Sequence, residues 1–436
     1  MIPTTLLKWL IRSGAARHIP ALRRRAGGSE AFAHYYSDRI LAAPVERLRD
    51  SATFPLTPFG TTIDLNAATP QLDAPASYAR PAGDRNRPVA GGLPALKRIV
   101  AERESERGRP TDADSEVVIT AGATAGYAAI CEAFLNPGDR VVVFDPSSPL
   151  FSLGAQSRRA TVRTVPTELV DGGMTYDPDA LSRALRGAKL LAIADPCNPT
   201  GASLNAAQLE HLVWAAKRSD VLIVLDESFD RFRYEGKPSS LPTLAGATER
   251  TLRLNSASAA YGLASARVGW VCGSEHLVKA VGLAALLSCP FVPTASQRVA
   301  LAQLSDEDEE RFGPEQQELR SRRNYAVDRL KALGFAVTIP TAGFFLWLDV
   351  SVFGIDGRRF AAELLAQTDV LVGPGFAFGA SGTNKIRLSY AIEDGRLREG
   401  LRRLATFVAG KRGEPLPTAS VRREVVAAAE PAFSRV

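Results

Sequence analysis

The sequence predicts an α/β protein in which a large domain is built on a mostly parallel sheet and a smaller α+β domain follows it. Three observations support this fold class. Short apolar runs alternate with helix-length segments from residue 117 onward, which is the order of elements that builds parallel sheets. Several runs, such as VVVF, LLAIA and VLIVL, are apolar on both faces, as strands buried between two helix layers are. At 436 residues, the chain is longer than a single hydrophobic core usually is.

Within the large domain, strands and helices are expected to alternate. The segment Thr124–Leu135 carries apolar residues at helical spacing and ends at Asn136-Pro137-Gly138-Asp139, a strong turn signal. A short β-branched run before it, Val117–Thr120, predicts a strand. The later segments repeat the alternation; in chain order they are the strands Arg140–Phe144 and Thr161–Val165, the helix Pro178–Arg186, the strand Lys189–Ala194, the helix Asn205–Ser219 and the strand Val221–Leu225.

The pattern changes after about residue 310 and indicates a smaller α+β domain. A long helix is expected at Pro314–Leu333, and a last helix ends near Gly410. Between them, three strands are expected, at Phe335–Ile339, Phe344–Val350 and Lys385–Ala391.

These patterns divide the chain into four parts. We expect a helical N-terminal extension at residues 1–55 and a large domain at residues 85–310. The small domain takes residues 56–84 and 311–412. Residues 413–436, rich in Pro, Arg and Ala, are expected to form a mobile tail.

The composition is that of an ordinary soluble globular protein, with 45% hydrophobic and 23% charged residues. The four cysteines are scattered without the spacing of a zinc site or a disulfide framework, which favours a reducing, cytoplasmic compartment and argues against a metal. No run approaches the roughly 18 apolar residues of a membrane span. The net charge of +6 favours anionic ligands. Since no nucleic-acid motif accompanies the basic residues, neither a membrane nor a nucleic-acid partner is expected.

Two motifs follow strands where α/β folds bind ligands. Thr120-Ala121-Gly122-Ala123-Thr124 lies between a strand and a helix, so that free N–H groups at the helix start and a glycine for close approach predict an anion site. Asp195-Pro196-Cys197-Asn198-Pro199-Thr200-Gly201 follows a buried strand, and its prolines and glycine indicate a rigid loop that presents Asn198 as a hydrogen-bond donor.

Two further motifs carry charge at the ends of strands. Asp226-Glu227-Ser228-Phe229 directly follows a fully apolar strand. A carboxylate there is costly unless a cation pairs with it, and a protonated pyridine nitrogen is one such cation. The segment from Ser256 to Trp270 places Arg267 at the start of an apolar strand, where its planar guanidinium suits a phosphate.

In this order, the four motifs resemble those of the class I/II aminotransferases, enzymes of fold type I that depend on pyridoxal 5′-phosphate (PLP). The resemblance covers roughly residues 60–410 and includes two small-domain segments, Ala342-Gly343-Phe344-Phe345 and Pro374-Gly375-Phe376-Ala377-Phe378-Gly379. It implies that the chain binds PLP and an amino-acid substrate. It also implies a homodimer whose active sites lie at the subunit interface.

The resemblance assigns a role to individual residues. Five of them would cradle the PLP phosphate: Gly122, Ala123, Thr124, Ser256 and Arg267. Asn198 would bond the phenolic oxygen of the ring. Asp226 would keep the ring nitrogen protonated, so that the ring withdraws electrons from the substrate carbanion. Arg387, in Ile386-Arg387-Leu388-Ser389-Tyr390, would clamp the substrate carboxylate.

The chain departs from the family at the catalytic centre. The position that carries the Schiff-base lysine in the family, eight residues before Arg267, is Ala259. That lysine forms the resting Schiff base and moves the α-proton, and a methyl group can do neither. Lys385, two residues before Arg387, is the only lysine that a motif places near the site.

Three explanations of Ala259 are open. The chain is an engineered Lys→Ala variant that binds substrate and PLP without turnover, a natural pseudoenzyme kept for binding or regulation, or an enzyme with a natural lysine-free PLP chemistry. The retention of Asn198, Asp226, Arg267 and Arg387 favours the first, in which this form is inactive for lack of the catalytic lysine.

Four other positions differ from the family pattern and indicate a remodelled substrate side. Ser148 stands where an aromatic residue usually stacks on the ring, so either stacking is lost or Phe151 supplies it. Phe229 stands where a tyrosine commonly donates a second hydrogen bond to the ring oxygen. Arg87 falls where a partner-subunit tyrosine usually approaches the phosphate, and Ala68 replaces a glycine that borders the substrate. Arg87 would favour a bulky or anionic substrate if it faces that pocket; alternatively it contacts only the phosphate.

Transamination of an amino acid, through external aldimine and quinonoid intermediates, is the leading functional hypothesis because it is the family's usual reaction. The alternative is elimination, replacement or carbon–carbon bond formation in specialised biosynthesis, which the changes at Ser148 and Phe229 keep open. A PLP-binding regulator is less favoured, since the first 60 residues contain no convincing helix-turn-helix.

Overall fold

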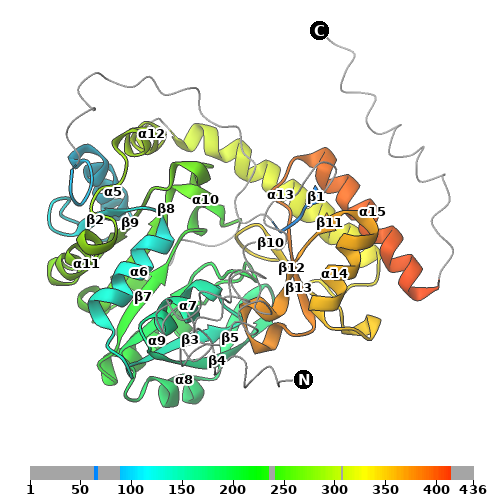
Figure 1. Ribbon diagram of the computed structural model, residues 1–436, viewed down its shortest axis with the longest axis horizontal. Coiled ribbons are helices and arrows are strands. Elements are labelled where there is room, and N and C mark those ends of the chain that lie inside the picture. Colours follow the sequence, from blue (N-terminus) through cyan, green and yellow to red (C-terminus); the bar gives the residue numbers. More distant parts are fainter. Residues whose placement is uncertain (1–62, 67–88, 235–240, 306–307, 414–436) are drawn as a thin grey trace, which may run out of the picture.

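The computed structural model describes residues 63–66, 89–234, 241–305 and 308–413, which form a large unit and a small unit side by side (Figure 1). The fold class is confirmed, because the large unit is an α/β structure on a mostly parallel sheet and the small unit is α+β. The predicted extension at 1–55 lies outside the described residues, and so does nearly all of the predicted tail. None of the helices in the described ranges is long and apolar enough to cross a membrane.

The sheet of the large unit has eight strands in the order β2-β9-β8-β7-β6-β3-β4-β5. The strands from β8 through β4 are parallel, whereas β9 runs antiparallel between β8 and β2, and β5 antiparallel to β4. Their bounds are β2 Val117–Thr120, β3 Arg140–Asp145, β4 Thr161–Val170, β5 Gly173–Tyr176, β6 Leu190–Ala194, β7 Leu222–Asp226, β8 Thr251–Ser256 and β9 Gly269–Cys272.

Helices cover both faces of this sheet, because alternate residues of each buried strand face opposite layers. On β3, Val142 and Phe144 pack in the core formed with α8 and α9, while Val141 and Val143 pack in the core formed with α6, α7 and α11. The helices of the large unit are α5 Pro94–Glu106, α6 Ala123–Phe134, α7 Pro149–Ser157, α8 Pro178–Leu185, α9 Ala206–Arg218, α10 Ala257–Ala260, α11 Glu275–Ser288 and α12 Thr294–Ser305.

The long helix α13 (Asp308–Ala332) leads from the large unit to the small one (Figure 1). The small unit has an antiparallel sheet in the order β10-β13-β12, and β1 pairs in parallel with β11. Its elements are β1 Ile63–Asp64, β10 Phe345–Asp349, α14 Gly357–Thr368, β11 Val370–Leu371, β12 Gly373–Pro374, β13 Lys385–Ser389 and α15 Asp394–Arg412.

One predicted strand is wrong. The segment Phe335–Ile339 belongs to no sheet and follows α13 directly. The amide of Phe335 donates back to the carbonyl of Leu330 at 3.1 Å, which ends the helix, and Pro340 has no N–H to pair with a neighbouring strand. The other predicted strands and helices of the described chain are present, with ends that differ by a few residues. The strands β1, β5, β8, β11 and β12 were not predicted.

The apolar core of the small unit provides a test of its packing. Phe360 is fully buried, and its ring lies 5.2 Å from Phe407 and 5.3 Å from Phe353. We expect Phe360→Ala to lower the free energy of unfolding by about 3–5 kcal/mol, measured by urea denaturation, because it removes a large buried ring. As a control, Val352→Ala, at a side chain that is 69% exposed, should change stability by less than about 0.5 kcal/mol. Equal effects of the two substitutions would contradict this packing.

Candidate active site

The carboxyl ends of the parallel strands bring the separate motifs to one edge of the sheet. Strand β7 ends at Asp226, β8 ends at Ser256, and Asp195 directly follows β6. The register holds these ends level, because Ala194 pairs with Asp226 and Asp226 with Leu254. Ligands of open α/β sheets bind at this edge.

An anion cup lies at the start of α6. Gly122 is the residue before the helix and has φ +86°, and the first amides of the helix, from Ala123 and Thr124 onward, have no carbonyl acceptor within the helix. The guanidinium of Arg267 lies so close that a Cβ on Gly122 would be 2.5 Å from its Nη2. Glycine is therefore favoured here by the backbone conformation, and a Cβ would displace the guanidinium of Arg267 from this position. Helix amides and a guanidinium facing one point form a binding site for a phosphate-like anion.

Two serines complete the surroundings of the cup. The Oγ of Ser256 accepts a hydrogen bond from the amide of Ser258 at 3.0 Å and so begins the short helix α10. The Oγ of Ser258 in turn accepts from Nη1 of Arg267 at 3.3 Å. Arg267 itself has a left-handed backbone, with φ +53°, which is uncommon for a residue with a side chain. The turn after α10 thus aims the guanidinium back toward α6.

Asp226 is a buried carboxylate at the end of β7. Its Oδ1 accepts hydrogen bonds from the amide and the hydroxyl of Ser228, at 2.9 and 2.5 Å. Burial raises the pKa of Asp226, and the bonds from Ser228 oppose that rise. A cationic ligand atom beside this carboxylate would favour its ionised form.

Arg387 on β13 reaches the same region from the small unit. Its Nη1 donates to Oδ1 of Asn198 at 2.9 Å, and its Nη2 donates to Asn66 at 2.9 Å, to both the carbonyl and Oδ1. The guanidinium lies over the rings of Phe345 and Phe378, at 4.3 and 4.7 Å from their centroids. Because its Oδ1 accepts from Arg387, the side chain of Asn198 presents its NH₂ group as a donor to another partner.

The charge of Arg387 is poised for an anionic ligand. Burial lowers the pKa of Arg387 to about 9, and Asp64 opposes that shift, so the side chain is a cation at neutral pH. Within the described chain its Nε has no hydrogen-bond partner. A buried guanidinium held by neutral amides, rather than by a carboxylate, is suited to bind the carboxylate of a ligand. Asn66 was missed from the sequence, although its segment was compared with the family at Ala68.

Ala259 lies on α10, between the cup and the small unit. It is 4% exposed and belongs to an apolar cluster that contains Phe229 and many small-unit residues. Lys385, the lysine that the motif places near Arg387, instead forms an ion pair with Asp349 at 2.9 Å. Lys385 is therefore engaged away from Ala259.

The structure also places the positions that differ from the family pattern. The Oγ of Ser148 caps α7 by accepting from the amide of Leu150 at 3.4 Å. The proposal that Phe151 stacks on a ring in the site is wrong, since α7 turns this side chain into the core, where it is fully buried at 5.2 Å from the ring of Tyr127. Phe229 packs edge-on against the rings of Phe344 and Phe345. Arg87 and Ala68 lie outside the described residues.

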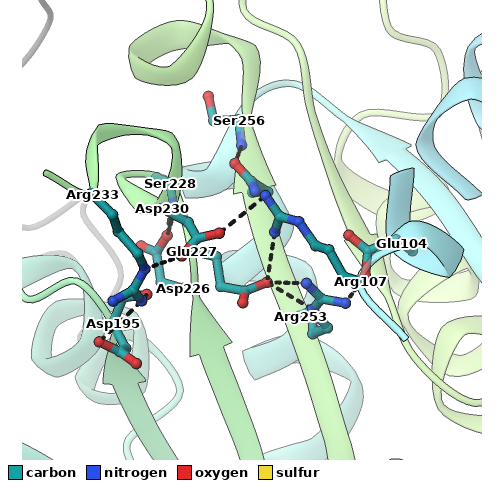
Figure 2. Close-up of polar contacts among 11 residues, drawn as sticks. Glu104, Arg107, Asp195, Asp226, Glu227, Ser228, Asp230, Arg233, Arg253 and Ser256 are labelled. Carbon is teal, nitrogen blue, oxygen red and sulfur yellow. Dashed lines mark hydrogen bonds and ion pairs between the residues drawn. The ribbon is translucent and has the colours of Figure 1, made fainter. Parts of the chain in front are cut away.

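A buried chain of alternating charges runs behind the site and was not predicted from the sequence (Figure 2). Arg253 on β8 pairs with Glu104 and, at 2.7 Å, with Glu227. Arg107 continues the chain, at 3.7 Å from Glu227 and 3.0 Å from Asp230. Burial raises the pKa of Glu227 to about 7, although Arg253 opposes that rise. Asp226 and Glu227 are thus neighbours with different surroundings: ionic partners surround Glu227, whereas in the described chain Asp226 accepts its side-chain hydrogen bonds from the neutral Ser228.

Comparison with known proteins identifies the family. The model of the family Aminotransferase class I and II matches residues 70–404. The chain belongs to this family. It is 31% identical over 355 residues to the aspartate/prephenate aminotransferase of Thermus thermophilus, with 79% of this chain and 90% of the relative covered. It is 30% identical over 362 residues to the arginine–pyruvate transaminase of Pseudomonas aeruginosa, with 80% and 91% covered.

Solved structures of aminotransferases have the same fold. The N-succinyldiaminopimelate aminotransferase of Mycobacterium tuberculosis superposes with a TM-score of 0.77 at 25% identity, covering 85% of this chain and 99% of that one. The aspartate aminotransferase of Thermus thermophilus with maleate gives 0.76 at 28% identity, covering 85% and 98%. Members of the class I and II family use PLP.

The cup is tested by a matched pair of glycine substitutions. Gly122→Ala and Gly138→Ala both place a side chain at a φ near +90°, which costs on the order of 1–3 kcal/mol. A Cβ at Gly138 meets nothing within 4 Å, whereas at Gly122 it meets Arg267. We expect inorganic phosphate to raise the thermal midpoint of the parent and of Gly138→Ala, relative to chloride at equal ionic strength, and to have little effect on Gly122→Ala. A phosphate effect that survives in Gly122→Ala would exclude this cup.

Proposed function

We propose that this chain binds PLP and an amino-acid carboxylate in an aminotransferase-type active site, and that Ala259 prevents it from completing the transfer of the amino group. The observation that carries the proposal is the convergence of three groups at one edge of the sheet: the cup at Gly122 and Arg267, the carboxylate of Asp226, and the guanidinium of Arg387. Each of these three groups suits a different part of PLP or of the amino-acid substrate.

The residues present fit the cofactor. The cup, with Ser256, would hold the phosphate, and Asp226 would hold the protonated ring nitrogen. The NH₂ group of Asn198, whose Oδ1 accepts from Arg387, would donate to the phenolic oxygen of the ring. When bound, the cofactor supplies an electron-withdrawing ring that stabilises negative charge on the substrate's α-carbon. Arg387 would bind the substrate carboxylate and so hold the α-carbon in place.

Proton transfer is the function that the chain lacks. A general base must lie within hydrogen-bond reach of the proton that it moves. The side chain at position 259 is a methyl group, and Phe229, in the same apolar cluster, has no hydroxyl. Binding would therefore persist while turnover would not. The retention of Gly122, Arg267, Asp226, Asn198 and Arg387 around a position without lysine supports the explanation that Ala259 replaces a catalytic lysine in an enzyme of this family.

The names of the relatives support an amino acid as substrate but do not single one out. They include aspartate/prephenate, LL-diaminopimelate and arginine–pyruvate aminotransferases. What these substrates share with the proposal is an α-carboxylate, for which Arg387 is placed. Elimination or carbon–carbon bond formation is the second candidate, because Ser148 caps α7 rather than presenting an aromatic ring. Keto-acid formation by the Ala259→Lys protein with amino donors would support transamination over this alternative.

We also propose a homodimer. Four apolar side chains on and after α11 are 44% exposed or more in the single chain: Leu283, Leu286, Leu287 and Phe291. A cluster of this kind marks an interface more often than free surface. We expect the protein to sediment as a dimer, and Leu287→Glu to shift it toward monomer, whereas Val352→Glu, at another exposed apolar position, should not. A monomeric parent, or a dimer unaffected by Leu287→Glu, would contradict this assignment.

The effect of having alanine at position 259 is tested by comparing the binding of two phosphorylated compounds. Without a Schiff base, the chain should bind pyridoxal 5′-phosphate and pyridoxine 5′-phosphate with affinities within about threefold, since their phosphates and ring nitrogens are alike. Restoring the lysine with Ala259→Lys should strengthen pyridoxal 5′-phosphate binding by about 100-fold or more and leave pyridoxine 5′-phosphate nearly unchanged. Both affinities can be measured by calorimetry.

A matched variant and a spectrum serve as controls. Ala260→Lys, one residue further along α10, should not produce the selective gain, because the position of the amine and not its presence decides it. Ala259→Lys should also acquire the long-wavelength absorption of a protonated Schiff base with pyridoxal 5′-phosphate. If the parent binds neither compound at millimolar concentration, the proposed function is wrong.

A further inference from the structure

Arg233 stands where three segments of the site meet. Its Nε donates to Oδ1 of Asp230 at 2.5 Å, on the segment that follows Asp226. Its Nη2 lies 3.4 Å from Oδ1 of Asp195, on the loop that carries Asn198, and donates to the carbonyl of Asp195 at 3.3 Å. The guanidinium therefore spans the ends of β6 and β7 beyond the last pairs of the sheet (Figure 2).

The same residue is tied to the rest of the loop and to the small unit. Its Nη1 donates to Oγ of Ser203 at 2.8 Å. Its backbone forms an antiparallel bridge with Ala342, whose amide donates to the carbonyl of Gly201 at 3.0 Å. The carbonyl of Arg233 accepts from the side chain of Gln316 on α13 at 2.5 Å. A displacement of Arg233 would therefore disturb the loop of Asn198, the small unit and α13, because Arg233 is bonded to all three.

The charge of Arg233 is maintained in spite of its burial. Its side chain is 10% exposed, and both carboxylates beside it are 1% exposed. Burial lowers the pKa of Arg233, but Asp195 and Asp230 outweigh this effect and raise it above the usual value. The planar guanidinium has several N–H donors in fixed directions, so it can donate to two chain segments at once. A lysine ammonium does this less well.

We propose that Arg233 is a positioning residue that sets the separation between Asp226 and the side chain of Asn198. This inference rests on the proposed function, in which those two residues hold two different positions of the pyridoxal ring, its nitrogen and its phenolic oxygen. Strand pairing already fixes the chain up to Asp195, whose amide donates to the carbonyl of Asp226 at 3.1 Å. Beyond that bond, the side chain of Arg233 links the two departing segments. In the described chain, the polar contacts of the Arg233 side chain are with Asp230, Ser203 and Asp195 and not with the cup at Gly122, so the cup should not depend on it.

The test separates ring binding from phosphate binding. In the full chain, Arg233→Gln should weaken pyridoxal 5′-phosphate binding about tenfold or more, because small displacements of positioned groups have large effects. The rise of the thermal midpoint in inorganic phosphate should remain within about twofold of the parent's rise. Arg233→Lys should restore part of the lost affinity, since it keeps the charge without the fork.

Arg250→Gln is the matched control. Arg250 is also a partly buried arginine of the large unit; its side chain is 19% exposed, lies 3.8 Å from Asp220 and donates to the carbonyl of Gly246 at 3.0 Å. It lies near the start of β8, at the other edge of the sheet from Asp226. Its substitution should leave pyridoxal 5′-phosphate binding unchanged, even if it lowers stability.

Each outcome decides the inference. If Arg233→Gln binds pyridoxal 5′-phosphate as well as the parent, or if ring and phosphate binding fall together, Arg233 has a structural role only.

If Arg233→Gln does not fold, Ser203→Ala replaces it, since this change removes one hydrogen bond and no charge. Ser203→Ala should weaken pyridoxal 5′-phosphate binding about threefold and leave the phosphate effect intact. No change in Ser203→Ala would then overturn the inference. If the parent itself does not bind pyridoxal 5′-phosphate, the proposed function fails, and this inference fails with it.

Discussion

The adjacent carboxylates at the end of β7 impose the constraint on which the site depends. Asp226 and Glu227 are both buried, and a buried charge is costly unless it is compensated. Glu227 is compensated within the chain, by Arg253 and Arg107. Asp226 has two hydrogen bonds from Ser228 in that role. The protein thus supplies cations for Glu227, and in the proposed function the cation that compensates Asp226 would come from the ligand.

The sequence was sufficient to predict the fold class and the order of most elements, because buried parallel strands are apolar on both faces and strong turns separate them. Gly122 and Arg267 could be paired in advance through the family resemblance. The chain of charges from Glu104 to Asp195 could not, since its members are scattered over more than a hundred residues and meet only through the strand order. Phe151 was misassigned because spacing from a motif does not show which way a helix turns a side chain.

The residues around Ala259 indicate how position 259 relates to the rest of the site. Ala259 brings no charge into its surroundings, because its methyl group packs among apolar residues of both units. The anion cup and Arg387 keep their geometry through contacts that do not include position 259, as the bonds of Arg387 to Asn198 and Asn66 show. In this account, binding and proton transfer are physically separate, so one can be lost while the other remains.

A crystal structure of the chain grown with saturating pyridoxal 5′-phosphate tests this account most directly. We predict the phosphate in the cup of Gly122, Ser256 and Arg267, the ring nitrogen within hydrogen-bond distance of Asp226, and no covalent bond between the cofactor and the protein. A cofactor bound at another place, attached to a lysine elsewhere, or absent from this edge of the sheet would contradict the account.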